Sequence, residues 1–169
     1  MIDKKIKVSN NITQPSKEGI INQAINFHMQ GNIQKAMKYY EYCINQDFND
    51  ETIFSNYGTI LESLGKLKEA ELSYRKAIEL NPNFANAHSN LGNILRDLDN
   101  LQEAELSTRK AIELNPNFAN AHSTLGIILR DLGNLKEAEI STRKAIELKP
   151  DFAEAHSNLG NILIDLGKL

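Results

Sequence analysis

Three histidines recur at equal intervals along the chain, at His88, His122 and His156, and metal binding would be their most obvious chemistry. An imidazole nitrogen is a common zinc ligand, but the ligands of one ion must converge within a few ångströms. Residues that recur with a repeat lie in separate structural units, so these three rings are kept apart. The single cysteine, Cys43, adds no Cys/His cluster with zinc-ligand spacing. We therefore interpret the histidines as structural and predict no metal and no other cofactor.

Covalent and acid–base chemistry have no candidate residues. The sequence contains no glycine-rich phosphate loop, no nucleophile motif and no acid–base pair that would converge in space. The chain is therefore predicted not to be an enzyme. The polar residues that recur most persistently are asparagines, whose side-chain amide offers an acceptor oxygen and two N–H donors. These side chains can form hydrogen bonds. Which groups they bond depends on the helices that position them.

An internal repeat organises the chain. Residues 81–114 and 115–148 are identical at 29 of 34 positions. The same period extends in both directions, which places repeats at 17–50, 51–84, 85–118 and 119–152, with a partial repeat at 153–169. Residues 1–16 lack this periodicity, and we expect a mobile N-terminal lead-in in which Ser16 caps the first helix.

Each repeat is predicted to be a pair of short helices, because apolar residues recur twice at three- and four-residue steps. Asn83 is predicted to cap the helix that follows it, as are its equivalents Asn117 and Asp151. The turns inside the pairs contain glycine or Asp-Asn, which suits a left-handed backbone. Gly92 and Gly126 fall inside helices, where glycine costs about 1 kcal/mol relative to alanine. We expect a close helix crossing at each glycine to compensate for this cost.

This pattern resembles the tetratricopeptide repeat, whose signature is W-x2-L-G-x2-Y, then A-x3-F, then P, recurring with the same period. The repeat at 51–84 fits best, and its matching residues are Phe54, Tyr57, Gly58, Leu61, Ala70, Tyr74, Ala77 and Pro82. In later repeats His88, His122 and His156 replace the tryptophan, and we interpret them as wedges between the two helices of a repeat. The resemblance implies an all-α fold, a right-handed α-solenoid of stacked antiparallel helix pairs.

In this family the first helix of each pair lines a concave groove, and the resemblance implies which places point into it. The sixth place holds asparagine in four repeats and threonine in one: Asn22, Asn56, Asn90, Thr124 and Asn158. The second, ninth and twelfth places add Asn86, Asn120, Asn93, Asn161, Arg96 and Arg130. The fifth place adds Ser55, Ser89, Ser123 and Ser157. These residues are the candidate peptide-binding groove.

An asparagine side chain can bond both the C=O and the N–H of an extended peptide, whatever the peptide's side chains. The asparagine series resembles the groove of the tetratricopeptide superhelix of O-GlcNAc transferase, which implies recognition of a peptide backbone. The alternative is that asparagine recurs only because the repeats are recent copies of one another.

A second arrangement in the family, a clamp for a terminal carboxylate, needs lysine and arginine at defined groove places. Those places hold uncharged residues here: Ser55, Thr59, Asn90, Asn120 and Thr124. Without cations to pair with a carboxylate, this clamp is not predicted.

The charge balance limits the classes of molecule that this chain is expected to bind. The chain has 19 Lys+Arg and 22 Asp+Glu, a net charge of -3, with no basic surplus to neutralise phosphates or to coat an anionic membrane. We therefore predict a protein or peptide partner, no nucleic acid and no membrane. The acidic balance and the 34-residue period also argue against the RNA-reading pentatricopeptide family. The N-terminus lacks the apolar run of a signal peptide, so we expect a cytoplasmic location.

Three functions remain open. The preferred one is a non-catalytic scaffold for protein–protein interaction that binds a peptide segment of a partner in the groove. A second is the substrate-recruiting arm of a larger enzyme, such as a glycosyltransferase or a sulfotransferase, because Leu169 falls where the second helix of the fifth repeat should begin. A third is end-to-end self-association through the apolar residues Ile162, Leu166 and Leu169.

Overall fold

The structure is a computed structural model that describes residues 16–168. The predicted lead-in therefore lies outside the described residues, except for Ser16. The Ser16 Oγ accepts a hydrogen bond from the Gly19 backbone N–H at 3.1 Å and caps helix α1, Lys17–Met29, as predicted. The chain divides into two compact units, Met1–Phe48 and Asn49–Leu169.

Among its described residues, 16–48, the first unit contains one helix pair, α1 and α2, and α2 spans Ile33–Asn45. The turn between them passes through Gly31, whose φ of 71° is a left-handed conformation that glycine adopts without strain. The buried side chains of the pair include Ala24, Ala36, Tyr40 and Cys43. Cys43 thus occupies the small-residue position of the core.

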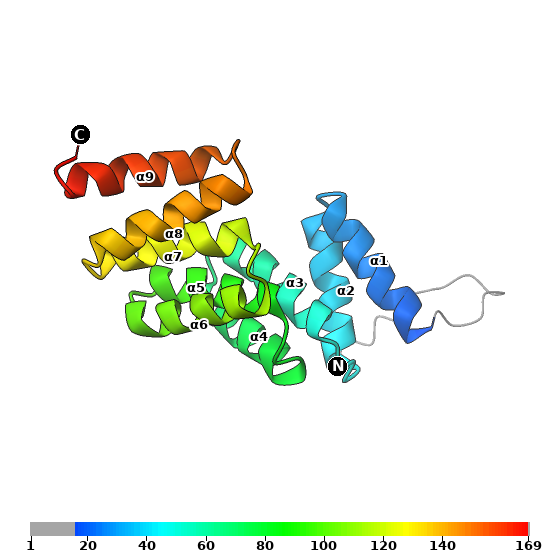
Figure 1. The fold of residues 1–169 in the computed structure, drawn as a ribbon. Coiled ribbons are helices and arrows are strands. Elements are labelled where there is room, and N and C mark those ends of the chain that lie inside the picture. The colour runs from blue at the N-terminus through cyan, green and yellow to red at the C-terminus, as the bar shows by residue number, and fades with distance from the viewer. Residues whose placement is uncertain (1–15, 169) are drawn as a thin grey trace. The chain divides into compact units, whose positions relative to one another are not determined.

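Between residues 49 and 168, the second unit contains three helix pairs and one further helix, which Figure 1 labels. They are α3 (Glu51–Ser63), α4 (Leu67–Leu80), α5 (Ala85–Asp97), α6 (Leu101–Leu114), α7 (Ala119–Asp131), α8 (Leu135–Leu148) and α9 (Ala153–Asp165). The two helices of each pair pack together, and each second helix also packs on the first helix of the next pair. Every regular element within residues 16–168 is a helix, so the predicted all-α solenoid of helix pairs is confirmed. None of these described helices has the length and apolar character needed to cross a bilayer.

Glycine lets the paired helices approach closely at their crossing points. A Cβ placed on Gly92 of α5 would lie 2.1 Å from the Thr108 Oγ1 of α6. The same distance separates a Cβ on Gly126 of α7 from the Thr142 Oγ1 of α8. Any side chain at these glycines would collide with the second helix. The close crossings predicted for Gly92 and Gly126 are therefore confirmed.

The turns within the pairs have the backbone conformation that their residues predict. Gly65, Asp99 and Gly133 have φ values of 72°, 61° and 81°, all in the left-handed region. Aspartate tolerates this region better than most residues that carry a Cβ. Each turn therefore ends the first helix and reverses the chain within a few residues.

The residues predicted to cap the first helices of the later repeats do not cap them. Phe84, not Asn83, is the N-cap residue of α5, and no side chain caps this helix. The Asn83 backbone N–H instead donates to the Asn81 Oδ1 at 3.1 Å, which folds the loop into a turn before the helix. The N-cap residues of α7 and α9 are likewise the phenylalanines after Asn117 and Asp151. The predicted caps are wrong because the helices begin one residue later than the side-chain pattern indicates.

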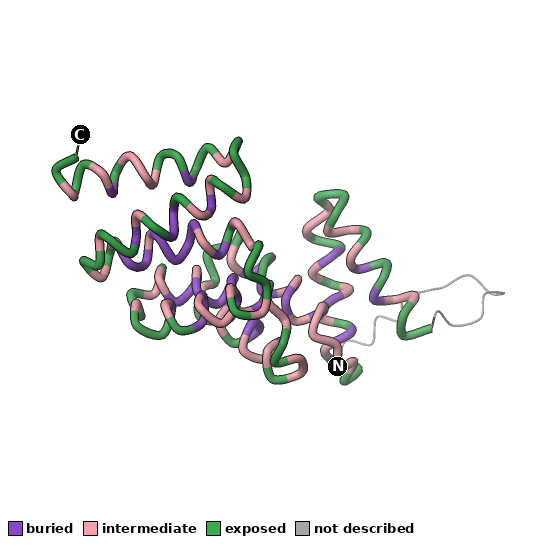
Figure 2. The backbone as a smooth tube through the Cα atoms, viewed as in Figure 1, coloured by how far each residue is buried: buried purple, intermediate pink, exposed green. Residues whose placement is uncertain are grey.

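The last helix, α9, carries fewer buried residues than α5 or α7 (Figure 2). Its buried residues are Ala155 and Ile162. Ile162 and Leu166 pack against a core cluster of the preceding repeat, which comprises Leu125, Leu129 and Ala138. These two residues therefore do not form the free apolar end that the sequence analysis predicts, and Leu169 lies outside the described residues.

Candidate functional site

The predicted groove residues of the second unit lie on its first helices. Successive first helices are neighbours, since α3 contacts α5, α5 contacts α7 and α7 contacts α9. At the sixth place, Asn56, Asn90 and Asn158 are half-buried and Thr124 is 7% exposed. The sixth-place side chains are therefore partly enclosed by their neighbours and not fully in solvent.

Two hydrogen bonds join predicted groove residues across neighbouring first helices. The Thr124 hydroxyl of α7 donates to the Asn93 Oδ1 of α5 at 2.9 Å. The Asn158 Nδ2 of α9 donates to the Ser123 Oγ of α7 at 3.4 Å. Each bond uses one group of an amide that has an acceptor oxygen and two N–H donors. An asparagine in this position can thus hold two helices together and still bond a ligand.

The fifth-place serines differ from their predicted position in the groove. Ser55, Ser89 and Ser123 are buried, and only Ser157 is exposed. The hydrogen bond from Asn158 shows that the Ser123 hydroxyl faces the next first helix. The prediction is wrong for these three serines because they are buried, and in Ser123 the hydroxyl lies against the next first helix. Ser157 lies on α9, which no later helix follows within the described residues.

The remaining candidates lie in more exposed positions. Asn86, Asn120 and Asn161 are exposed on the second unit, and Asn22 is exposed on α1 of the first unit. Arg96 and Arg130 are half-buried, and the two make different ion pairs. Arg96 pairs with Asp97, its neighbour in α5, at 2.7 Å. Arg130 pairs with Asp165 of α9 at 2.5 Å, and so links two first helices.

A polar cluster around the Tyr74 hydroxyl of α4 was not predicted from the sequence. This hydroxyl lies 2.8 Å from the Glu62 Oε2 and 3.2 Å from the Thr59 Oγ1, both on α3. The Asn90 side chain of α5 also interacts with it. Burial raises the pKa of Tyr74 well above its ordinary value, so the phenol is protonated at neutral pH. Asn90 is thereby connected to the preceding helix pair.

The three recurring histidines each contact the loop that precedes their own helix. The Nε2 atoms of His88, His122 and His156 lie 3.0, 2.9 and 2.9 Å from the carbonyl oxygens of Pro82, Pro116 and Pro150. A carbonyl only accepts hydrogen bonds, so each Nε2 carries the proton. The first two rings are half-buried and His156 is exposed, so they are not buried wedges between helices. No group of residues within 16–168 is arranged to hold a metal ion.

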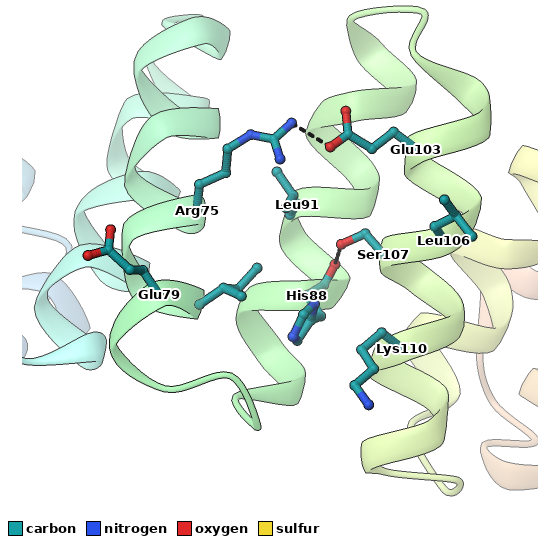
Figure 3. Close-up of a pocket in the computed structure, with 9 residues that line it drawn as sticks. Arg75, Glu79, His88, Leu91, Glu103, Leu106, Ser107 and Lys110 are labelled. Carbon is teal, nitrogen blue, oxygen red and sulfur yellow. Dashed lines mark hydrogen bonds and ion pairs between the residues drawn. The ribbon is translucent and has the colours of Figure 1, made fainter.

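A pocket of about 500 Å³ lies between α4 and α6, with α5 beneath it (Figure 3). Arg75 of α4 and Glu103 of α6 form an ion pair across it at 2.7 Å. Arg109 of α6 and Glu137 of α8 form the equivalent pair at 2.5 Å. The apolar lining consists of Ile78, Leu91 and Leu106. Sequence reasoning missed this pocket, although the equal spacing of arginine and glutamate in both pairs was a usable signal.

The repeated pairs, their glycine crossings and their left-handed turns define an all-α helical-repeat protein. A family model described as TPR repeat matches residues 58–99 and 126–167. Two models described as tetratricopeptide repeat match residues 85–118 and 108–140. Together these matches span residues 58–167, more than half of the chain. The chain belongs to the tetratricopeptide-repeat family.

Solved structures of this family have the same fold. The crystal structure of MamA is 25% identical, with a TM-score of 0.76 over 86% of this chain and 85% of MamA. YrrB, described as a TPR protein with an unusual peptide-binding site, is 23% identical, with a TM-score of 0.76 over 92% of this chain and 80% of YrrB. The first TPR of Spaghetti (RPAP3), bound to the HSP90 peptide SRMEEVD, is 25% identical, with a TM-score of 0.68 over 70% of this chain and 94% of that domain. A search of curated protein sequences found no match.

Proposed function

We propose that this chain is a non-catalytic scaffold for protein–protein interaction, and that the first helices of its second unit bind an extended peptide segment of a partner. The observation that carries this proposal is the set of half-buried asparagines on the first helices α3, α5 and α9: Asn56, Asn90, Asn93 and Asn158. An amide that is partly enclosed is held in place by its neighbours, so little side-chain freedom is lost when a ligand binds.

The chemistry of this surface favours recognition of the peptide backbone. Asparagine bonds both the C=O and the N–H of an extended chain, and neither bond depends on the side chains of the ligand. Each hydrogen bond contributes about 0.5–1.5 kcal/mol net, before the cost of ordering the peptide. A few such bonds give an affinity in the micromolar to millimolar range. The site is therefore suited to sequence-tolerant binding of weak affinity.

The RPAP3 domain supports a peptide ligand, because it is bound to the peptide SRMEEVD. That peptide is acidic and ends in a carboxylate, whereas the corresponding clamp places of this chain hold uncharged residues such as Ser55, Asn90 and Thr124. An uncharged site gives a peptide carboxylate no ion pair. We therefore propose an internal, extended segment as the ligand, not an acidic C-terminus. The absence of nucleic-acid and membrane partners remains a prediction from the charge balance, and a cytoplasmic location remains a prediction from the N-terminal sequence.

The experiment selects heptapeptides from a random phage library on the purified chain and measures their affinities by fluorescence anisotropy. The triple variant Asn56→Ala, Asn90→Ala and Asn158→Ala should bind the selected peptides at least tenfold more weakly, with an unchanged helical circular dichroism spectrum. A matched control changes three exposed asparagines on other surfaces, Asn83, Asn117 and Asn134, to alanine and should bind as the wild type does. Equal affinity of the two triple variants would show that the asparagines recur only as copies.

A further inference from the structure

Helix α5 carries asparagine at both the sixth and the ninth groove places, and different partners hold the two side chains. Asn90 and Asn93 lie three residues apart, so their side chains are neighbours on one face of the helix. The Asn93 Oδ1 accepts a hydrogen bond from the Thr124 hydroxyl of α7 at 2.9 Å. Its oxygen is thus engaged, and both N–H groups of Nδ2 are left for a ligand. Asn93 therefore meets a ligand as a hydrogen-bond donor.

The amide of Asn90 is held in the opposite sense by the preceding helix pair. The Tyr74 hydroxyl has one proton and lies 2.8 Å from the Glu62 Oε2. A carboxylate only accepts hydrogen bonds, so the phenol donates its proton to Glu62. The phenol oxygen can then only accept, and the Asn90 side chain that bonds it must do so through Nδ2. Because the oxygen and the nitrogen of an amide diverge from Cγ, the Asn90 Oδ1 is turned away from Tyr74 and is left to accept a hydrogen bond from a ligand.

The role of Tyr74 is not repeated at its equivalents in the next two repeats, which are Thr108 and Thr142. The Thr108 hydroxyl donates to the Ala104 carbonyl oxygen of its own helix at 2.8 Å. The Thr142 hydroxyl has no hydrogen-bond partner within residues 16–168. Among the described repeats, a threonine at this position does not hold the next sixth-place residue as Tyr74 holds Asn90. The chain therefore fixes the amides most completely at α5.

We infer that Tyr74 and Thr124 are positioning residues, which fix Asn90 as an acceptor and Asn93 as a donor for one residue of the bound peptide. This inference rests on the proposed peptide-binding function and adds a requirement at the same site. An extended residue presents its N–H and its C=O at the same edge, so it can donate to Asn90 and accept from Asn93. Proline has no backbone N–H. The segment bound at α5 therefore needs a residue other than proline at this position, and any side chain is otherwise accepted.

The first test reverses the chemistry of each amide with a nearly isosteric substitution. The probe is a heptapeptide selected on the wild-type chain, and its affinity is measured by fluorescence anisotropy. Asn93→Asp replaces the donors with a carboxylate that repels the peptide C=O, and binding should weaken at least tenfold. Asn90→Asp keeps an acceptor for the peptide N–H, and binding should weaken by about threefold or less. The two variants add the same charge one turn apart on α5, so equal losses would overturn the inference.

The second test determines whether Tyr74 acts through Asn90. Each peptide bond of the heptapeptide is replaced in turn by an ester, which exchanges one N–H for an oxygen. One ester should weaken wild-type binding about fivefold or more, because its oxygen meets the Asn90 Oδ1, and Asn90→Ala should abolish this penalty. Tyr74→Phe frees the amide to turn, so the penalty should fall below about twofold. Ser107→Ala is the matched control, since it removes a hydroxyl that α6 donates to the His88 carbonyl oxygen at 2.9 Å, and it should keep the wild-type penalty.

Glu62→Gln tests the same contact without changing a buried ring. The neutral amide of glutamine can donate to the phenol oxygen, which leaves the Tyr74 proton free for the Asn90 Oδ1. The ester penalty should therefore fall as it does in Tyr74→Phe. A penalty that persists in both variants would overturn the positioning role and leave the proposed function intact. Unchanged peptide affinity in the triple asparagine variant would instead overturn the proposed function, and this inference with it.

Discussion

Gly92 of α5 faces Thr108 of α6 so closely that a Cβ on the glycine would lie 2.1 Å from the threonine Oγ1. The same relationship recurs between Gly126 and Thr142. Gly160 has the same helical position in α9 but faces no second helix within the described residues. The helix pair therefore requires glycine at the first two positions and only tolerates it at the third.

This difference predicts opposite effects for one substitution. Gly92→Ala should lower the free energy of unfolding by about 1–3 kcal/mol, because the helices must separate to accept the Cβ. Gly160→Ala should raise it by about 0.5–1 kcal/mol, because alanine is the better helix former and no contact opposes it. Urea unfolding followed by circular dichroism measures both values. A loss of stability in Gly160→Ala equal to that in Gly92→Ala would contradict the crossing geometry.

The hydrogen bond between Thr124 and Asn93 predicts an energetic coupling between α5 and α7. Thr124→Val keeps the shape of the side chain but removes the hydroxyl that donates to the Asn93 Oδ1 at 2.9 Å. The variant should lose about 0.5–1.5 kcal/mol of unfolding free energy. Asn93→Ala should then cost less in the Thr124→Val background than in the wild type. Additive losses in this double-mutant cycle would show that the bond contributes nothing to stability.

The buried phenol of Tyr74 predicts a loss of stability at alkaline pH. Burial raises the folded-state pKa of Tyr74 above the unfolded value near 10, so above pH 10 the unfolded chain releases this proton first. The free energy of unfolding should therefore fall as the pH rises above 10. Tyr74→Phe has no proton to release at this position, so its stability should fall less steeply over the same pH range. Parallel pH profiles for the two proteins would contradict a raised pKa.

The ion pair between Arg109 and Glu137 is expected to make a small, salt-dependent contribution to the free energy of unfolding. Its side chains are 40% and 50% exposed, so solvent screens the interaction that joins α6 to α8. A double-mutant cycle with Arg109→Ala and Glu137→Ala should give a coupling of about 0.2–1 kcal/mol that decreases in 1 M NaCl. A coupling that salt leaves unchanged would indicate that the pair acts through packing.

The fold could be predicted from the repeat because its period and its glycines indicated the same helix pairs. The period of the repeat located the helix pairs, and Gly92 and Gly126 marked where their helices cross. Ser16 was recognisable as a cap because a hydroxyl before a helix has few other roles. The loop before α5 was predicted wrongly because Asn81 and Asn83 are both turn and cap residues, and the choice between the roles depends on the backbone path.

The candidate site was less predictable, because it depends on contacts between repeats. A period locates equivalent residues but gives no distance between neighbouring units. Ser123 was placed in the groove by resemblance, whereas it lies against Asn158 of the next first helix. The ion pair between Arg75 and Glu103 joins residues of different pairs, so their spacing in the sequence acquires meaning only when α4 and α6 are known to be adjacent.

The central claim, that asparagines of the first helices bind a peptide backbone, is tested most directly by nuclear magnetic resonance. Side-chain NH2 signals of asparagine appear in a 1H–15N correlation spectrum and can be followed as a selected peptide is added. We predict saturable shifts for Asn56, Asn90 and Asn158, with the loop residues Asn81 and Asn115 unchanged. Saturation of peptide binding without any shift of the three first-helix asparagines would contradict this claim.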